Sequence, residues 1–116
     1  VVEDNDLNRR LFVDLLSTRG HTIWEATDGP AALELVQKKQ PDLVLMDIQL
    51  PNVSGLDITQ QIRQMALKKQ PRIVAVSAFA LKQDADKAIK AGCDDYISKP
   101  ISIGPFFATI EKNLKR

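Results

Sequence analysis

The sequence has little of what disulfide-bonded, thiol-dependent or membrane-spanning proteins require. Cys93 is the only cysteine among 116 residues, which excludes an intrachain disulfide and fits a reducing, cytoplasmic compartment. His21 is the only histidine and lies far from Cys93 in the chain, so the sequence does not favour a Cys–His nucleophilic site. No apolar run approaches the roughly 18 residues of a transmembrane helix, and no signal peptide is visible, so we expect no membrane insertion.

An excess of charge of either sign is also lacking. Sixteen Lys and Arg residues against fifteen Asp and Glu residues give a net charge of +1. This balance predicts no direct binding to nucleic acid or to an anionic membrane surface. The apolar fraction of 44% and the charged fraction of 27% are those of an ordinary globular protein, and the length suits a single domain.

What the sequence does contain is a regular alternation of short apolar runs and helical patterns. Strands are expected at residues 1–2, 22–26, 43–46, 72–76 and 96–98, and a helical pattern follows each of them. The third and fourth of these runs are continuously apolar and not alternating, which is typical of parallel strands covered on both faces. We therefore predict an α/β protein with a doubly wound, five-stranded parallel sheet and flanking helices.

The helical patterns also predict which side chains face the core. In the first helix Leu7, Leu11 and Leu15 recur every four residues, with Phe12 and Leu16 beside them. We expect this set to form one buried face. By the same argument the buried face of the fourth helix includes Ala88 and Ile89, and that of the last helix consists of Phe106, Phe107, Ile110 and Leu114.

Polar side chains stand where the expected strands end. Glu3 and Asp4 follow the first strand, Asp47 ends the third, and Ser77 and Lys99 follow the fourth and the fifth. Ligands of an open parallel sheet bind beyond the carboxyl ends of its strands, so we expect these side chains to meet at one edge.

The groups at this edge suit phosphoryl transfer. Three carboxylates in contact repel one another unless a cation lies among them, and oxygen ligands with room for water suit Mg²⁺. Asp47 is the candidate nucleophile, because a carboxylate that attacks phosphorus forms an aspartyl phosphate. Lys99 could neutralise one phosphoryl oxygen, and the Ser77 hydroxyl could donate a hydrogen bond to another.

Each residue also has a simpler interpretation. Glu3 and Asp4 could cap the first helix, and Ser77 could be an ordinary strand-end residue. Lys99 could be a solvated loop lysine, and Tyr96 a half-buried strand aromatic. All the simpler interpretations together would require a coincidence at four separate strand ends, which favours the functional interpretation.

Four segments resemble the receiver domain of two-component response regulators. They are Glu3-Asp4-Asn5, MDIQLP with Asp47, VSAFA with Ser77, and YISKP with Lys99. Within that family MDIQLP, SAFALK and YISKPIS are most similar to stand-alone receivers of the DivK cell-division type. Receivers inside hybrid histidine kinases, which act as phosphorelay intermediates, have much of the same sequence in these segments.

The resemblance implies a fold and a metal site. The fold is the (βα)5 flavodoxin-like one with strand order 2-1-3-4-5. The ion is Mg²⁺, bound by the carboxylates of Asp4 and Asp47, by Glu3 through water, and by the backbone carbonyl of Gln49. The family's usual first strand is longer, so we expect residues 1–116 to be a receiver domain whose first strand is truncated at the N-terminus.

The resemblance also implies a switch. Asp47 would accept phosphate from a phosphohistidine on a histidine kinase or a phosphotransfer protein. Ser77 and Tyr96 would rearrange with it, Lys99 would pair with the phosphate, and the Lys99–Pro100 peptide would be cis. A downstream protein target would read the fourth helix, the fifth strand and the last helix.

Two neighbouring positions refine this interpretation. Phe79, two residues after Ser77, would slow hydrolysis of the aspartyl phosphate by limiting the approach of water. Phosphatases that work through an aspartyl phosphate commonly need a second acid two residues after the nucleophile, where this chain has Gln49. We therefore expect a protein that catalyses only its own phosphorylation and dephosphorylation.

Overall fold

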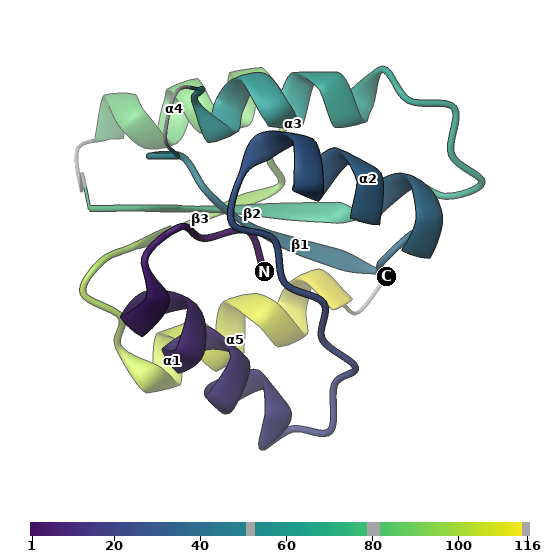
Figure 1. The fold of residues 1–116 in the computed structure, drawn as a ribbon. Coiled ribbons are helices and arrows are strands. Elements are labelled where there is room, and N and C mark those ends of the chain that lie inside the picture. The colour runs from purple at the N-terminus through teal and green to yellow at the C-terminus, as the bar shows by residue number, and fades with distance from the viewer. Residues whose placement is uncertain (51–52, 79–81, 115–116) are drawn as a thin grey trace.

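The computed structural model describes residues 1–50, 53–78 and 82–114. Among these residues there are five helices: α1 (Asp6–Ser17), α2 (Gly29–Lys39), α3 (Gly55–Arg63), α4 (Lys82–Ala91) and α5 (Ile103–Leu114). The strands are β1 (Leu43–Asp47), β2 (Arg72–Ser77) and β3 (Asp95–Ser98), which form a parallel sheet in the order β1-β2-β3. Figure 1 shows α2, α3 and α4 on one face of the sheet and α1 and α5 on the other.

Both faces of the sheet are buried, as the continuous apolar runs predict. On one face Val44, Met46, Ile73 and Ala75 pack with buried residues of α2, α3 and α4. On the other face Leu45, Val74, Val76 and Ile97 pack with α1 and α5. Successive strand residues point to opposite faces, so a strand with helices on both sides needs apolar residues throughout.

In the described chain, the two expected strands nearest the N-terminus are not full strands and take part only in isolated β-bridges. Val2 forms parallel bridges to Ala26 on one side and to Met46 on the other. The Val2 amide donates to the Leu45 carbonyl at 2.8 Å, and the Glu3 amide donates to the Ala26 carbonyl at 3.0 Å. Of the expected strand at 22–26, the described chain thus has one bridge, at Ala26. The five-stranded order stays a prediction.

The predicted buried face of the first helix is confirmed at Phe12 and Leu16 and wrong at Leu7 and Leu11. Leu7 and Leu11 are 81% and 43% exposed, whereas Phe12 and Leu16 are buried. The Phe12 ring stacks on Phe106 of α5, with 5.9 Å between the ring centroids. This contact turns Leu7 and Leu11 outward, since a helix on the surface of a sheet buries only one stripe.

The last two helices show how far the same argument holds. In α4 the small Ala88 is fully buried while its larger neighbour Ile89 is exposed, so that half of the prediction is also wrong. In α5 the predicted Phe106, Phe107 and Ile110 are buried as expected. An aromatic-rich face identifies the core side of a helix more securely than one drawn from small or solitary apolar residues.

Candidate functional site

The candidate site lies at the carboxyl edge of the sheet, where the chain leaves each strand. Asp47 is the last residue of β1 and pairs with Val76, directly before Ser77 at the end of β2. Ser77 pairs in turn with Ser98 of β3, and the Lys99 amide donates to the Ser77 carbonyl at 2.7 Å. The parallel register therefore brings these strand ends to one edge, as the sequence predicts.

Glu3, Asp4 and Asp47 form an acidic cluster. One carboxylate oxygen from each lies within 4.8 Å of the other two. Glu3 and Asp47 are only 1% and 2% exposed, whereas Asp4 is open to solvent. The Gln49 amide donates to Oδ1 of Asp47 at 2.9 Å and so fixes the orientation of that carboxylate. The cluster is buried on the side of Glu3 and Asp47 and open to solvent on the side of Asp4.

Lys99 brings a positive charge to this cluster. Its Nζ lies 2.9 Å from Oε1 of Glu3 and 3.5 Å from Oδ2 of Asp47. Burial alone would lower the pKa of Lys99, but the hydrogen bond to Glu3 and the charge of Asp47 outweigh burial and raise the pKa. The solvated-loop interpretation of Lys99 therefore does not describe this structure.

The cluster holds more negative charge than Lys99 can balance. Burial raises the pKa of the Glu3 carboxyl, the adjacent Asp47 carboxyl raises it further, and the hydrogen bond from Lys99 opposes both. Three carboxylates beside one ammonium leave negative charge that Lys99 alone does not balance. Oxygen ligands, two buried and one exposed, with a deficit of positive charge, fit a hard divalent cation such as Mg²⁺.

Asn5, and not Glu3 or Asp4, caps the first helix. The Asn5 side chain accepts a hydrogen bond from the Asn8 amide at 3.0 Å, which is the N-cap geometry. The Asn5 amide in turn donates to Oε2 of Glu3 at 3.3 Å. The helix-capping interpretation of the two acids is thus wrong, and both carboxylates are directed to the cluster.

The remaining predicted residues lie around this cluster. Ser77 is buried, and Tyr96 is half-buried in β3 opposite Ala75. The Lys99–Pro100 peptide bond is cis, as the resemblance implies. Phe79 lies outside the described residues.

Gly55 is a part of the site that lies outside the predicted metal ligands and reacting groups. It begins α3 directly beneath the end of β1, and a Cβ there would overlap the Asp47 carbonyl oxygen and come within 2.8 Å of the Ile48 Cα. Only glycine lets the helix approach the backbone that carries Asp47 so closely. A glycine eight residues after a strand-end carboxylate is a weak signal in sequence, since glycine also serves ordinary turns.

We expect Gly55→Ala to destabilise the domain by about 3 kcal/mol, because the methyl group would meet backbone atoms that cannot move aside. Urea unfolding followed by circular dichroism would measure this. Gly104→Ala is the matched control: no atom lies within 4 Å of the added methyl group, and the position is helical. Equal stabilities for the two variants would contradict the close approach at Asp47.

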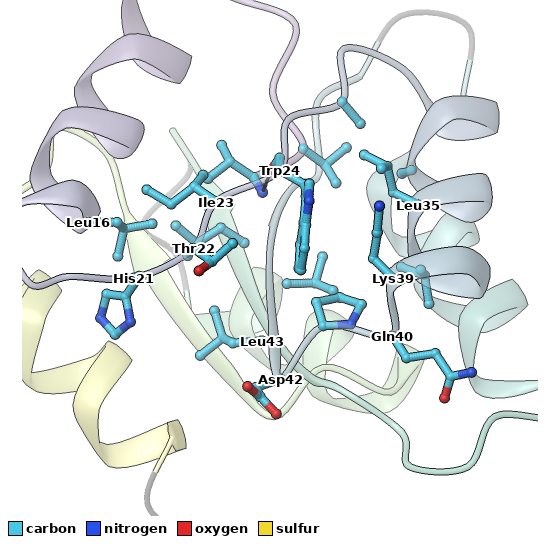
Figure 2. A pocket seen from close by; sticks show the side chains of 18 of the residues that line it. Leu16, His21, Thr22, Ile23, Trp24, Leu35, Lys39, Gln40, Asp42 and Leu43 are labelled. Carbon is cyan, nitrogen blue, oxygen red and sulfur yellow. Dashed lines mark hydrogen bonds between the residues drawn. The ribbon is translucent and has the colours of Figure 1, made fainter.

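A separate hollow of about 550 Å³ lies away from the acidic cluster (Figure 2). Its lining comes from the segment at 20–26, one side of α2, the start of β1, one residue of α1 and two residues of α5. Trp24, Leu43 and Lys39 are among the lining side chains labelled in Figure 2. The acidic cluster and Lys99 are not part of its lining.

None of the described helices has the length and apolar character needed to cross a bilayer.

Comparisons with known proteins agree with the geometry of the site. The profile of the response regulator receiver domain matches residues 1–111. The polar-differentiation response regulator DivK of Brucella anthropi is 44% identical over 114 residues, which are 98% of this chain and 93% of that protein.

Solved structures show the same fold. The receiver domain of NtrX from Brucella abortus has a TM-score of 0.89 at 28% identity, covering 98% of this chain and 95% of that one. A CheY-like response regulator receiver domain from Methylobacillus flagellatus has a TM-score of 0.86 at 31% identity, covering 97% and 93% of the two chains.

Proposed function

The chain belongs to the family of response regulator receiver domains, and on that premise we propose that Asp47 is its phosphoacceptor. One observation carries the proposal: the Asp47 carboxylate, at the end of β1, lies beside two further carboxylates and the ammonium of Lys99. The phosphodonor is a phosphohistidine on a histidine kinase or on a phosphotransfer protein. The resulting change of charge makes the domain a signalling switch.

The chemical step is a displacement at phosphorus. A carboxylate oxygen of Asp47 attacks the phosphorus, the P–O bond forms, the P–N bond to the histidine breaks, and the histidine nitrogen keeps the electron pair. Glu3, Asp4, Asp47 and the Gln49 carbonyl would hold Mg²⁺, which supplies positive charge to the phosphoryl oxygens when bound. Lys99 shifts from Glu3 toward the new phosphate, and the Ser77 hydroxyl donates to one of its oxygens.

The switch reaches the rest of the molecule through the elements that carry these side chains. Ser77 ends β2, Lys99 follows β3, and Tyr96 lies in β3 between α4 and α5. Movement of Ser77 and Lys99 toward the phosphate changes the packing around Tyr96. The surface formed by α4, β3 and α5 is therefore the one that a downstream protein target would read.

The proposal includes the complete sheet order 2-1-3-4-5, in which the numbers count the five expected strands in chain order. In this count β1, β2 and β3 of the structure are strands 3, 4 and 5. Val2 bridges to Ala26 and to Met46, so the chain at Val2 lies between the segment at 22–26 and β1. An experimental structure with Val2 at the outer edge of the sheet would contradict this order.

The wild-type chain, incubated with acetyl phosphate and Mg²⁺, should gain the mass of one phosphoryl group, and EDTA should prevent the gain. Amide NMR shifts on phosphorylation should concentrate in α4, β3 and α5. A chain that gains no phosphate under these conditions would contradict the proposed function. Steady turnover of a simple phosphomonoester would favour an aspartyl-phosphate phosphatase instead, but Gln49 offers no acid for the leaving group.

The setting of the switch follows from its relatives. The 44% identity to DivK over nearly the whole chain supports a role in polar differentiation and the cell cycle. A receiver inside a hybrid histidine kinase, acting as a phosphorelay intermediate, would use the same chemistry. Phosphate transfer from Asp47 onward to a histidine phosphotransfer protein would distinguish the relay from the terminal switch.

A further inference from the structure

Arg9 joins three parts of the chain next to the acidic cluster. It lies in α1, and its NH1 donates to the backbone carbonyl of Glu3 at 3.2 Å. Its NH2 donates to Asp6 at 2.7 Å, and its Nε donates to Glu25 at 3.2 Å. The side chain is only 18% exposed, so these are not contacts of a freely moving surface arginine.

The contact with Glu3 completes the restraint of that residue. The Glu3 amide is bonded to the Ala26 carbonyl, and the Asp47 amide donates to the carbonyl of Val2 at 3.0 Å. The backbone carbonyl of Glu3 takes part in neither of these bonds, and it accepts the hydrogen bond from Arg9. Glu3 is thereby held on both sides of its Cα while its carboxylate meets Asp47 and Lys99.

We propose that Arg9 is a positioning residue of the divalent-cation site, which holds the turn of Glu3 and Asp4 in its metal-binding conformation. The inference rests on the proposed function, because that function requires the metal. A guanidinium is well suited to such a role, because its planar fork makes several directed hydrogen bonds at once, whereas an ammonium is a point charge. Mutation of the partners that orient metal ligands typically weakens metal binding by about 10- to 100-fold.

The sign of the effect separates positioning from simple electrostatics. Arg9 is a cation near a site that binds a cation, so through charge alone its removal would strengthen Mg²⁺ binding. Loss of the hydrogen bond from Arg9 to Glu3 would instead weaken Mg²⁺ binding. Without that bond the turn of Glu3 and Asp4 would become ordered only when the metal binds, and this ordering costs binding free energy. Weaker binding in a variant without the guanidinium is therefore specific to positioning.

The test is a Mg²⁺ titration of the full chain, followed by the amide NMR shifts of Asp4 and Gln49. Arg9→Gln should raise the dissociation constant by about tenfold. Arg9→Lys should fall between this variant and the wild type, because lysine keeps the charge and loses the fork. If Arg9→Gln does not fold, the Arg9→Lys result decides: affinity equal to the wild type would overturn the inference.

Arg19→Gln is the matched control for a neighbouring arginine just beyond the same helix. Arg19 also forms an ion pair, to Glu111 at 3.2 Å, and its guanidinium lies 4.1 Å from the centre of the Phe107 ring, away from the site. This variant should keep wild-type Mg²⁺ affinity whatever it loses in stability. An Arg9→Gln affinity equal to or tighter than that of Arg19→Gln would overturn the inference.

Failure of the inference and failure of the proposed function have different signatures. If the wild type binds no Mg²⁺ and gains no phosphate from acetyl phosphate, both are overturned. If the wild type does both and Arg9→Gln matches it, only the role of Arg9 is overturned. With saturating Mg²⁺ the phosphorylation rate of Arg9→Gln should return close to that of the wild type, since Arg9 does not touch the reacting atoms.

Discussion

Asp47→Asn should reduce phosphate uptake from acetyl phosphate to background, a loss of at least about 100-fold. The amide of asparagine cannot attack phosphorus as a carboxylate does, and the substitution also removes one of the three acids of the cation site. The side chain keeps its shape, so the fold should survive. Intact-protein mass spectrometry after incubation with acetyl phosphate and Mg²⁺ measures the effect directly.

Asp42→Asn is the control, since it makes the same change at the other end of the same strand. Asp42 immediately precedes β1 and its side chain is exposed, whereas Asp47 ends β1 and is buried. Asp42→Asn should therefore take up phosphate at the wild-type level. If Asp47→Asn retained that level, another residue would be the phosphoacceptor and the assignment of Asp47 would be wrong.

Lys99→Met should lower the free energy of unfolding by about 3 kcal/mol at neutral pH without divalent cations, because it leaves the buried carboxylates of Glu3 and Asp47 without their cation. Methionine retains most of the apolar stem of lysine, so the loss measures charge more than packing. Mg²⁺ should restore part of the stability, since it places positive charge in the same cluster. Urea unfolding with EDTA and with Mg²⁺ measures both effects.

The pH dependence of this loss has a definite sign. The pKa of Glu3 is raised in the folded protein, first by burial and then by Asp47, so the folded state takes up a proton more readily than the unfolded one. Stability from that proton is present at low pH and is lost as pH rises through the raised pKa. The difference between Lys99→Met and the wild type should therefore shrink as pH falls toward the usual range of a glutamate.

Lys112→Met provides the control for a lysine in an exposed ion pair. Lys112 lies 3.8 Å from Asp95, and its side chain is largely exposed. Exposed pairs of this kind contribute about 0–1 kcal/mol, so this variant should stay close to wild-type stability. Equal losses for Lys99→Met and Lys112→Met would show that Lys99 does not stabilise a buried acidic cluster.

Several features of this protein could be derived from its sequence alone. The continuous apolar runs at 43–46 and 73–76 indicated strands buried on both faces, and the structure has β1 and β2 there. The polar residues at the strand ends indicated one edge of the sheet, and the structure brings Glu3, Asp4, Asp47 and Lys99 together there. These inferences succeed because the residue pattern of a strand depends only on its own sequence. In addition, parallel strands run in the same direction, so their carboxyl ends lie at the same edge of the sheet.

Only the tertiary structure decided which of several similar side chains are buried, which contact the site, and where a side chain is excluded. The stack of Phe12 on Phe106 determines that Leu7 faces solvent, and the path of the chain beside Ala26 lets Arg9 reach the Glu3 carbonyl. The close approach of α3 to Asp47 explains why Gly55 must lack a side chain. The stack of Phe12 on Phe106 joins segments distant in the chain, and the contacts of Arg9 and Gly55 depend on how the chain turns between the partners. A helical repeat tells which residues share a face but not which face another helix will cover, so these assignments required the packed structure.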